Sequence, residues 1–431
     1  MPLNILALSG AVCYNFISRV VTMRLTLRGD FRVRAIFGEI ANLNKKGMKF
    51  GVETTRRILD ELGAPDKKLK IIHIAGTNGK GSTAEYISRI LIAAGKRTGT
   101  FSSPMVESYF DQFKVDGKPI DEAVLSEYFQ AAYAAAKGGA TEFEVQTAGA
   151  LYAFFKEGCE YAVVECGLGG KLDATNAIAQ KEVAVISSIG IEHTAFLGNT
   201  YAKICAHKAG IINNCPAIVN ALQPSEAREY FKKLGVTFAE KGFRIKNIGL
   251  DGVKFTYDGR EYKTHMYGRE QAYDAATAIE AMHTLKLDED AIQSGVFEAN
   301  LAGRLQVLTA SGNIYIVDGG HNPSGIKPLA ELINNFPAEK VEIIFGCLAD
   351  KDIRGNLRTL EGLAKKITAV QPDSPRALDI NKISAACKKY FTVVGEDKSV
   401  SAALEKAKGV VVVCGSFTLV KEALNWIEKK L

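Results

Sequence analysis

The sequence predicts an α/β protein with two domains, and three observations support this fold class. Apolar runs of strand length alternate with helical patterns almost throughout the 431 residues. A glycine-rich loop near residue 76 joins one such strand to a helix, as in P-loop domains with mostly parallel sheets. A second alternating series begins after Gly303-Arg304 and predicts a smaller, Rossmann-like C-terminal domain.

Composition excludes several classes of protein. The chain is 47% hydrophobic and 24% charged, which is typical of globular domains with real cores. Its net charge of +6 is modest, so a nucleic-acid partner is not expected. The eight cysteines are scattered, mostly in apolar runs, and include no C-x-x-C pair. They are expected to be reduced core thiols of a cytoplasmic protein.

Residues 1–22 need a separate interpretation, because Ile5–Val12 is apolar enough to resemble the core of a signal peptide. No basic residue precedes this run, and Met23 offers a second start. We therefore expect a non-essential extension rather than an export signal. No apolar run approaches the roughly 18 residues of a membrane span, so no membrane partner is expected.

The first domain, 23–300, is expected to hold a mostly parallel sheet with a small antiparallel addition. Its apolar strands are expected at 70–75, 97–101, 161–166, 183–189 and 216–220. Two alternating pieces, 253–257 and 261–265, predict a hairpin that turns at Asp258-Gly259. A helix over about 269–285 is expected to close this domain.

The second domain, 301–431, is expected to be doubly wound. Its strands are expected at 314–318, 341–346, 367–370, 391–395 and 409–414. Three of these strand ends carry Asp318, Gly346 and Gly415, at the edge where ligands bind in such sheets. Two domains of this kind suggest a ligand cleft between them.

The glycine-rich loop carries the strongest functional signal. It consists of seven residues, Gly76, Thr77, Asn78, Gly79, Lys80, Gly81 and Ser82. Glycines let backbone N–H groups turn toward an anion, Lys80 can reach outer phosphates, and Ser82 can bind Mg²⁺. ATP is therefore the expected cofactor. Gly81 departs from the usual pattern, in which Ser or Thr directly follows Lys.

Three further residues follow the predicted strands of the first domain or lie in its helices. Glu165 ends an apolar strand, which is the arrangement that holds Mg²⁺ beside a P-loop, although a solvated strand end gives the same pattern. His193 follows the next strand and is a candidate metal or phosphate contact. Lys208 lies in an apolar helical setting that is ordinarily typical of a surface lysine.

The turn Asp318-Gly-Gly-His321-Asn-Pro323 joins a strand to a helix in the second domain. Such a turn presents carboxylate, imidazole and amide groups at a helix start, but a capped loop without function is an equal alternative. Ser416 follows Gly415 in a similar turn, whose signal is weak by itself.

Taken in order from about Met48 to the C-terminus, the motifs resemble those of the folylpolyglutamate synthase/dihydrofolate synthase family, a branch of the Mur ligase superfamily. They are GTNGKGS, Ser102-Ser103-Pro104, Thr141–Glu144, ECGLGGKLDATN, IEHTAFLG, HKAGI, GRLQ, DGGHNP, Ala349–Asp352 and CGSF. The glycine between Lys80 and Ser82 is characteristic of this branch.

The resemblance implies an ATP-dependent acid-amino-acid ligase. A substrate carboxylate would take the γ-phosphoryl group, and the amine of L-glutamate would attack the acyl phosphate. The acceptor would be a reduced folate, dihydropteroate or both. ATP and two Mg²⁺ ions are the implied cofactors, and we expect a monomer.

The resemblance also implies residue roles, which fall into three groups. For nucleotide, it implies Gly76–Ser82, Asp274, Arg304 and Asp318, with Lys80 on the β and γ phosphates. For metal, it implies Ser82, Glu165, His193 and Lys208, the last as a carbamylated lysine. For substrates, it implies Ser102, Ser103, Pro104, Phe143 and Glu144 beside the pterin, and His321 with Ser416 at glutamate.

Some positions depart from the family pattern. Met105 replaces a usual histidine, Glu192 an aspartate, His207 a glutamate, and Asp274 an asparagine. Two alternatives stay open: a cell-wall Mur ligase acting on a UDP-linked precursor, and a non-catalytic nucleotide-binding protein. The first normally has another domain before its P-loop, and the second has little reason to retain Glu165, His193 and the DGGHNP turn.

Overall fold

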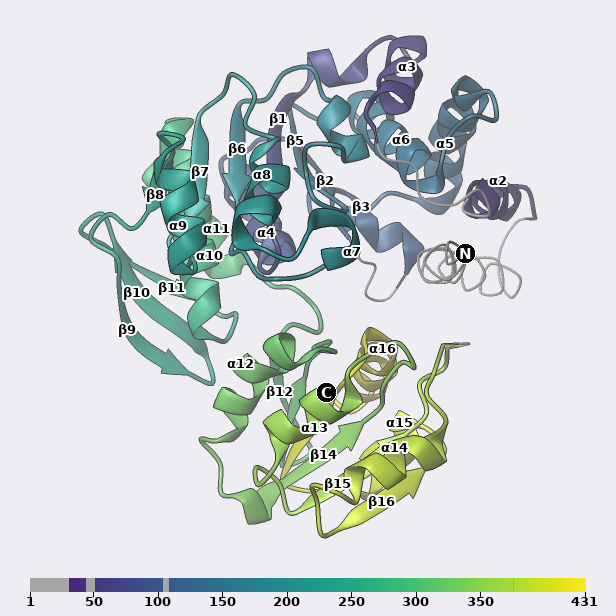
Figure 1. Cartoon of the computed structure of the whole chain (residues 1–431), viewed down its shortest axis with the longest axis vertical. Coiled ribbons are helices and arrows are strands. Elements are labelled where there is room, and N and C mark those ends of the chain that lie inside the picture. The colour runs from purple at the N-terminus through teal and green to yellow at the C-terminus, as the bar shows by residue number, and fades with distance from the viewer. Residues whose placement is uncertain (1–30, 44–50, 104–107, 375) are drawn as a thin grey trace, which may run out of the picture. The chain divides into compact units, whose positions relative to one another are not determined.

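The computed structural model describes residues 31–43, 51–103, 108–374 and 376–431, so residues 1–22 and Pro104 lie outside the described residues. The chain forms two compact units (Figure 1). The larger unit comprises the described residues up to Lys246 together with Lys254–Thr264 and Glu270–Ala299, and the smaller unit comprises Asn247–Val253, His265–Arg269 and Asn300–Leu431. The limits expected from the sequence, 23–300 and 301–431, stay a prediction.

An eight-stranded sheet forms the centre of the larger unit, in the order β4-β3-β2-β5-β1-β6-β7-β8. The strands are β1 (Lys70–Ala75), β2 (Thr98–Phe101), β3 (Phe113–Val115), β4 (Lys118–Pro119), β5 (Tyr161–Glu165), β6 (Val183–Ile186), β7 (Ala217–Asn220) and β8 (Thr237–Ala239). β1 lies between β5 and β6 and is parallel to both. β2, β7 and β8 extend the parallel part, whereas β3 and β4 are antiparallel. Strands buried on both faces are expected to be continuous apolar runs, as these are.

Helices cover both faces of this sheet (Figure 1). The helices of the larger unit are α2 (Phe31–Asn42), α3 (Glu53–Glu61), α4 (Lys80–Ala93), α5 (Glu122–Ala136), α6 (Glu142–Lys156), α7 (Thr194–Leu197), α8 (Tyr201–Ala209), α9 (Ser225–Lys232), α10 (Arg269–Thr284) and α11 (Glu289–Glu298), with short 3₁₀ turns η2 (Pro65–Lys68), η3 (Tyr109–Gln112) and η4 (Ala174–Ala177). α4 packs against β1, β2 and β5. Apolar residues of α5 and α6 form one core cluster with Phe101 and Val164, and those of α8 and α9 form another with Ile186 and Val219.

A three-stranded antiparallel sheet accompanies the larger one, in the order β11-β10-β9. The predicted hairpin corresponds to β10 (Gly252–Tyr257) and β11 (Arg260–Thr264). The third strand, β9 (Arg244–Gly249), was not predicted because its side chains are mostly exposed and lack apolar alternation. The predicted helix 269–285 corresponds to α10, but it does not close the unit, because α11 follows and packs against α4.

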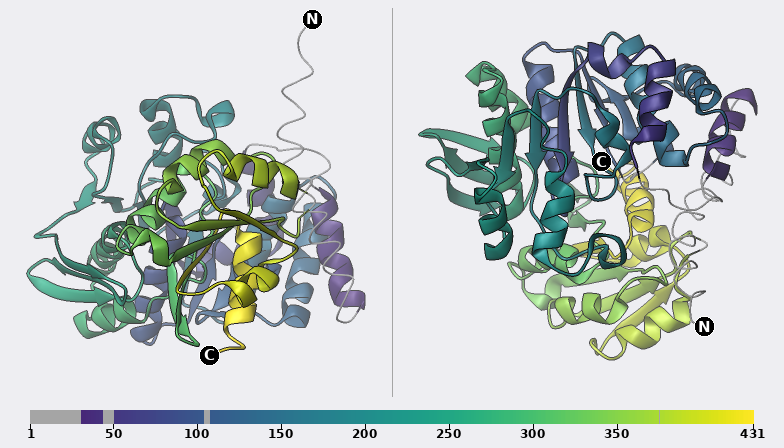
Figure 2. Two further views of the ribbon diagram at one scale, coloured as in Figure 1. Left: turned by 90° about the horizontal axis from the view of Figure 1, so that it is seen from below. Right: turned by 45° about the horizontal axis from the view of Figure 1, so that its top comes forward.

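The smaller unit is a six-stranded sheet in the order β12-β13-β17-β14-β15-β16. Its strands are β12 (Gln306–Ala310), β13 (Asn313–Val317), β14 (Val341–Phe345), β15 (Lys366–Val370), β16 (Val394–Asp397) and β17 (Val410–Cys414), and its helices are α12 (Pro323–Ile333), η5 (Ala338–Lys340), α13 (Ile353–Leu360), α14 (Ile380–Cys387), α15 (Val400–Lys406) and α16 (Phe417–Ile427). All neighbours are parallel except the β12–β13 pair. α12, α13 and α14 pack on one face, and α15 and α16 on the other (Figure 2). The predicted α/β fold class is confirmed.

Two predicted strands differ from the structure by more than one residue at an end. The strand predicted at 183–189 ends at Ile186, because residues 187–190 turn aside to contact the glycine-rich loop. The strand predicted at 391–395 begins only at Val394. Phe391 is a buried loop residue of the smaller core, so its apolar character reflects packing rather than strand pairing.

The described residues include no helix with both the length and the apolarity that a membrane crossing requires. Their seven cysteines are free thiols, and all but Cys215 are buried. Burial raises the pKa of several of these thiols, as at Cys205, where it reaches about 11. A thiol with so high a pKa is a poor nucleophile, which agrees with the expected core role.

Candidate active site

The glycine-rich loop leaves β1 after Ala75 and leads into α4 at Lys80. Gly76 and Gly79 have positive φ angles of 152° and 85°. A Cβ at Gly76 would lie 1.8 Å from Ser187 Oγ, and one at Gly79 would lie 2.5 Å from an Asp274 carboxylate oxygen. Both positions therefore require glycine, and the loop backbone is held close to the elements around it.

Asp274 lies on α10 and is buried against this loop. Its Oδ1 accepts a hydrogen bond from Asn220 Nδ2 at 2.9 Å. Burial raises the pKa of the Asp274 carboxyl well above its ordinary value, and the nearby charge of Glu270 raises it further. A carboxyl that retains its proton approaches an amide in hydrogen-bonding capacity, so the replacement of the family's asparagine is physically reasonable.

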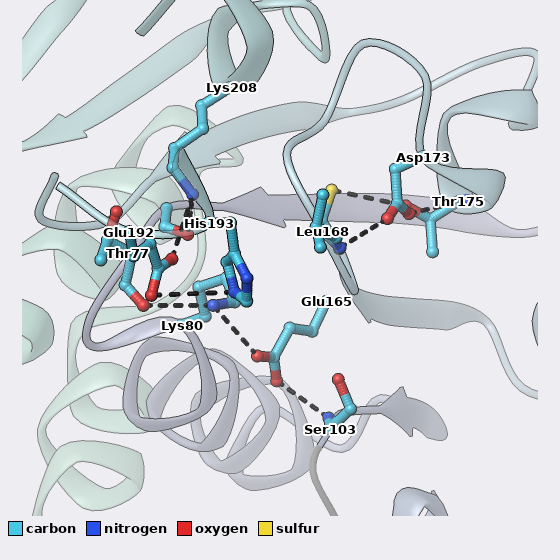
Figure 3. Close-up of polar contacts among 12 residues, drawn as sticks. Thr77, Lys80, Ser103, Glu165, Leu168, Asp173, Thr175, Glu192, His193 and Lys208 are labelled. Atoms are coloured by element: carbon cyan, nitrogen blue, oxygen red, sulfur yellow. Dashed lines mark hydrogen bonds and ion pairs between the residues drawn. The ribbon is translucent and has the colours of Figure 1, made fainter. Parts of the chain in front are cut away.

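Lys80 and Glu165 face each other at the start of α4 and the end of β5 (Figure 3). Lys80 Nζ donates to the Thr77 carbonyl at 3.2 Å and lies 3.8 Å from Glu165 Oε1. Glu165 is only 3% exposed, and its Oε2 accepts the N–H of Ser103 at 3.1 Å. Gly81 and Ser82 lie in the first turn of α4; Ser82 is buried, and its hydroxyl accepts from Gln271 Nε2 at 3.3 Å.

Lys208 reaches the same loop from α8 (Figure 3). Its Nζ donates to the Gly76 carbonyl at 2.5 Å and lies 3.6 Å from Glu192 Oε1. The residue is 1% exposed, and this burial, with the nearby charge of Lys80, lowers the pKa of Lys208 to about 8. The interpretation of Lys208 as a surface lysine is therefore wrong.

His193 lies at the N-terminal end of α7 in the left-handed backbone region, with φ of 48°. Its side chain is about half exposed, and Nε2 lies 3.9 Å from Glu192 Oε2. Glu192 thus stands between the imidazole of His193 and the ammonium of Lys208 (Figure 3).

A buried polar network fixes the loop that follows Glu165. Asp173 Oδ2 accepts the N–H of Leu168 at 2.7 Å, and Oδ1 accepts both the N–H and the hydroxyl of Thr175. The Thr175 hydroxyl also lies 2.8 Å from His73 Nε2, which contacts the Cys166 thiol at 3.1 Å. Burial raises the pKa of Asp173 and lowers that of His73. These hydrogen bonds hold the loop in place beside Glu165.

The residues predicted to bind the acceptor lie near Glu165 and at the start of α6. The Ser102 N–H donates to the Gln112 carbonyl at 3.2 Å, and Ser103 contacts Glu165. The Phe143 ring packs closely against Gly167, where a Cβ would lie 2.5 Å from it. Glu144 accepts from the backbone and hydroxyl of Thr141, so it forms a capping box at the start of α6.

In the smaller unit, the predicted residues gather at the carboxyl ends of β13 and β17. Asp318 accepts the N–H of Leu305 at 2.9 Å and of Gly320 at 2.7 Å, and burial raises its pKa. His321 Nδ1 lies 3.0 Å from the Gly319 carbonyl, and burial, followed by the charge of Lys351, lowers the pKa of His321.

Ser416 and Arg304 both lie beside Phe417, at the start of α16. The Ser416 hydroxyl accepts the N–H of Thr418 at 3.2 Å and so caps the helix. The Arg304 guanidinium lies 4.6 Å from the centre of the Phe417 ring, within the range of a cation–π contact. The structure thus brings Arg304, Asp318, His321 and Ser416 to one edge of the smaller sheet.

Two family models match this chain, the Mur ligase middle domain over residues 74–286 and the Mur ligase glutamate ligase domain over residues 303–417. The dihydrofolate synthase/folylpolyglutamate synthase of Bacillus subtilis is 30% identical over 412 residues, which cover 88% of this chain and 95% of the relative. The chain belongs to the folylpolyglutamate synthase/dihydrofolate synthase family of Mur ligases. The Escherichia coli enzyme of the same name is 31% identical, with 91% and 94% covered.

Solved structures agree with this assignment to the folylpolyglutamate synthase/dihydrofolate synthase family. The folylpolyglutamate synthase of Thermotoga maritima has a TM-score of 0.81 at 28% identity, covering 91% of this chain and 97% of its own. The Mycobacterium tuberculosis enzyme, solved with ADP and AMPPCP, has a TM-score of 0.79 at 28% identity, with 91% and 98% covered. The resemblance stated from the sequence motifs is confirmed.

Within the described residues of this family member, no cluster of three or more His, Cys, Asp or Glu side chains could hold a metal ion. The side chains near the glycine-rich loop, Gly76–Ser82, which we call the phosphate loop from here on, are nevertheless suited to bind a hard cation. Glu165 offers a buried carboxylate whose ammonium neighbour lies 3.8 Å away, beyond a direct hydrogen bond. Ser82 offers a hydroxyl, and phosphate oxygens and water normally complete such a site.

Several residues that shape the site were not found from the sequence. Gln271 contacts Ser82, and Asn220 contacts Asp274, from elements distant in the chain. Gln223 contacts residues 187 and 189 beside the phosphate loop. None of them belongs to a local motif. Asp173 and Thr175 belong to the LDATN motif, which was the available signal for the network behind Glu165.

Proposed function

We propose that this protein is an ATP-dependent ligase that adds L-glutamate to a reduced folate, to dihydropteroate, or to both, through an acyl phosphate. The observation that carries the proposal is the convergence of Lys80, Glu165 and Lys208 on the glycine-rich loop. Membership of a family whose curated relatives are named dihydrofolate synthase/folylpolyglutamate synthase supports it. Structures of relatives with ADP and AMPPCP support the nucleotide.

The nucleotide would bind along Gly76–Ser82, where the N-terminal N–H groups of α4 favour an anion. Lys80 would neutralise charge on the β and γ phosphates as the phosphoryl group moves to the substrate carboxylate. Ser82 and Glu165 would hold Mg²⁺, which supplies electrostatic stabilisation of the transferring phosphoryl group. The Ser103 N–H keeps the Glu165 carboxylate oriented for this role.

Lys208 and His193 are proposed for a second metal ion. Because burial lowers its pKa to about 8, Lys208 is in the neutral amine form more often near neutral pH than an ordinary lysine is. A neutral amine can add to CO₂, forming an N–C bond and releasing one proton, and the product is an anionic carbamate. ¹³C NMR with ¹³C-bicarbonate should then show a carbamate signal that is missing in Lys208→Arg, and equal spectra would contradict carbamylation.

The remaining proposed roles concern the substrates. Asp274, Arg304 and Asp318 are proposed nucleotide contacts, and His321 with Ser416 are proposed to bind the incoming glutamate. Ser102, Ser103 and Phe143 are proposed to lie beside the pterin-bearing substrate, together with Pro104. Glu144 would act there through its cap on α6, which fixes the position of Phe143. We also expect a monomer in the cytoplasm.

Phosphate release tests the proposed function directly. The reactions contain ATP, Mg²⁺ and L-glutamate, with dihydropteroate, with tetrahydrofolate, or with no acceptor. We expect at least one of the two acceptors to stimulate phosphate release and to gain one glutamate by mass spectrometry. A UDP-linked cell-wall precursor serves as the control acceptor. Stimulation by neither pterin compound would overturn the proposed function.

A further inference from the structure

The segment that follows β6 supports the phosphate loop through backbone contacts. The Ser188 carbonyl accepts the N–H of Thr77 at 2.9 Å and of Asn78 at 3.2 Å, and Asn78 and Ser188 form an antiparallel bridge. The Thr77 hydroxyl donates to the Gly190 carbonyl at 3.2 Å. The position of residues 187–190 therefore sets the position of the first part of the loop.

Gln223 holds this segment from the neighbouring strand. The Ile189 N–H donates to Gln223 Oε1 at 3.0 Å, and Gln223 Nε2 donates to the Ser187 carbonyl at 3.1 Å. These two backbone groups lie on either side of Ser188, the residue that anchors the loop. One side-chain amide thus fixes both neighbours of the anchoring residue.

The two bonds have the pattern of parallel strand pairing. In a parallel ladder, one residue accepts from the N–H after its partner and donates to the C=O before it. Backbone pairing between β6 and β7 ends with Ile186 and Val219. Beyond this point the backbone of β7 turns away from β6. The side-chain amide of Gln223 then makes the pair of hydrogen bonds that a backbone amide of β7 would otherwise make.

The same turn reaches the other end of the loop. Asn220 Oδ1 accepts the Leu222 N–H at 2.8 Å, which stabilises the turn, and Asn220 Nδ2 donates to Asp274. Asp274 in turn lies against Gly79, the last residue before α4. Residues 220–223 therefore support both ends of the loop, the first through Gln223 and the last through Asn220 and Asp274. These four residues belong to none of the nucleotide-binding motifs described above.

We propose that Gln223 is a positioning residue for nucleotide binding. Its carboxamide keeps Ser188 in the register that anchors Thr77 and Asn78, and this directs the N–H groups at the start of α4 toward phosphate. The hydrogen bonds of Gln223 within the described residues go to Ser187, Ile189 and Ala221, and we assign none of these to phosphate or metal binding. The inference rests on the proposed function, because it takes the loop to be the ATP site.

The test compares Gln223→Met with the wild type and with Gln293→Met, a change at an exposed position of α11. Methionine keeps the length of glutamine but removes both hydrogen bonds. Calorimetry with a non-hydrolysable ATP analogue and Mg²⁺ gives Kd, and steady-state kinetics give KM for ATP and for L-glutamate. We expect Kd and KM for ATP to rise about tenfold in Gln223→Met, with KM for glutamate within about twofold of wild type. Gln293→Met should match the wild type.

Two results would overturn the inference alone: a wild-type Kd in Gln223→Met, or equal rises of both KM values together with a lowered Tm. Gln223→Glu provides a second variant, because it keeps the acceptor for Ile189 and loses the donor to Ser187. It should also bind the analogue more weakly, and it decides the matter if the methionine variant does not fold. A wild-type protein that fails to bind the analogue would instead overturn the proposed function, and this inference with it.

Discussion

Three ionisable side chains, Lys80, Glu165 and Lys208, determine the charge around the phosphate loop. Each is held in place by contacts with its neighbours. Lys80 and Glu165 lie 3.8 Å apart, and Lys208 donates to the carbonyl of Gly76. Removing charge here should impair catalysis far more than folding, because phosphoryl transfer relies on positioning and charge neutralisation.

We expect Lys80→Ala and Glu165→Gln each to lower kcat at least about a hundredfold, as is typical when a group that stabilises transition-state charge is lost. Glutamine retains the size of Glu165 and can still accept the Ser103 N–H, so Tm should change little. Phosphate release and circular dichroism provide the measurements. Turnover close to wild type in either variant would contradict the assigned roles.

His321 should make the smaller unit sensitive to acid. Burial lowers its pKa from the ordinary 6.5, so below that pH the unfolded chain binds a proton that the folded chain resists. Stability is therefore lost as the pH falls from 6.5 toward the lowered folded pKa. Between pH 7.5 and 5.5, wild type should lose up to about 1 kcal/mol more than His321→Gln.

Urea unfolding followed by tryptophan fluorescence tests this prediction, because the single tryptophan, Trp426, lies on α16 of the smaller unit. Comparing the two proteins at each pH removes the contribution of other titrating groups. Equal losses in wild type and His321→Gln would show that the imidazole does not contribute.

The sequence predicted those site residues that belong to short, continuous motifs. Gly76, Lys80 and Glu165 were found because a strand end and a glycine loop lie within a few residues of one another. Gln223 and Gln271 act across the fold, so no local pattern marks them. The burial of Lys208 could not be predicted from the sequence either. The pattern of a helix indicates its apolar face, but it does not indicate which neighbouring segments cover a lysine on that helix.

Among the elements, α11 shows how closely helices pack behind the phosphate loop. Gly295 lies against α4, where a Cβ would be 2.3 Å from Ile90 Cα and 2.4 Å from Ile90 N. These are backbone atoms, which cannot move aside as a flexible side chain can. Ile90 lies in the third turn of α4, the helix whose first turn carries Lys80 and Ser82.

We expect Gly295→Ala to lower the free energy of unfolding by about 2 kcal/mol, because overpacking outweighs the better helix propensity of alanine. Gly38→Ala in α2 is the matched control. Among the described residues, no heavy atom beyond the neighbouring backbone of α2 lies within 4 Å of a Cβ there, so alanine should stabilise the helix by up to about 1 kcal/mol. Denaturant unfolding measures both, and a stabilised Gly295→Ala would contradict the close contact.

The elements that the sequence predicted well are the buried parallel strands and α10, whose apolar periodicity is strong. The structure adds the strands β3, β4, β8, β9 and β12 and the helix α11. β12 is an antiparallel edge strand of mixed burial, and β9 is largely exposed, so neither has a clear pattern. α11 contains Gly295, which weakens its helical signal, although Asp288 is a good N-cap.

For the whole molecule, the proposed residues come from both compact units, Lys80 from the larger and His321 from the smaller. If one chain supplies a complete set, a mixture of inactive Lys80→Ala and inactive His321→Ala proteins should stay inactive. The expected monomer makes this outcome necessary. Phosphate release by the mixture gives the readout, and restored activity would show that copies of the chain complete one another.

The central position of β1 also determines which parts of the chain exchange amide hydrogens slowly. β1 pairs with β5 and β6, and five of its six residues are fully covered, so its amides should exchange with deuterium only when the whole unit opens. The phosphate loop begins directly after this strand. β1 therefore provides an internal reference: its deuterium uptake should stay near zero with and without nucleotide. A change in uptake at residues 76–82 on adding nucleotide can be measured against it.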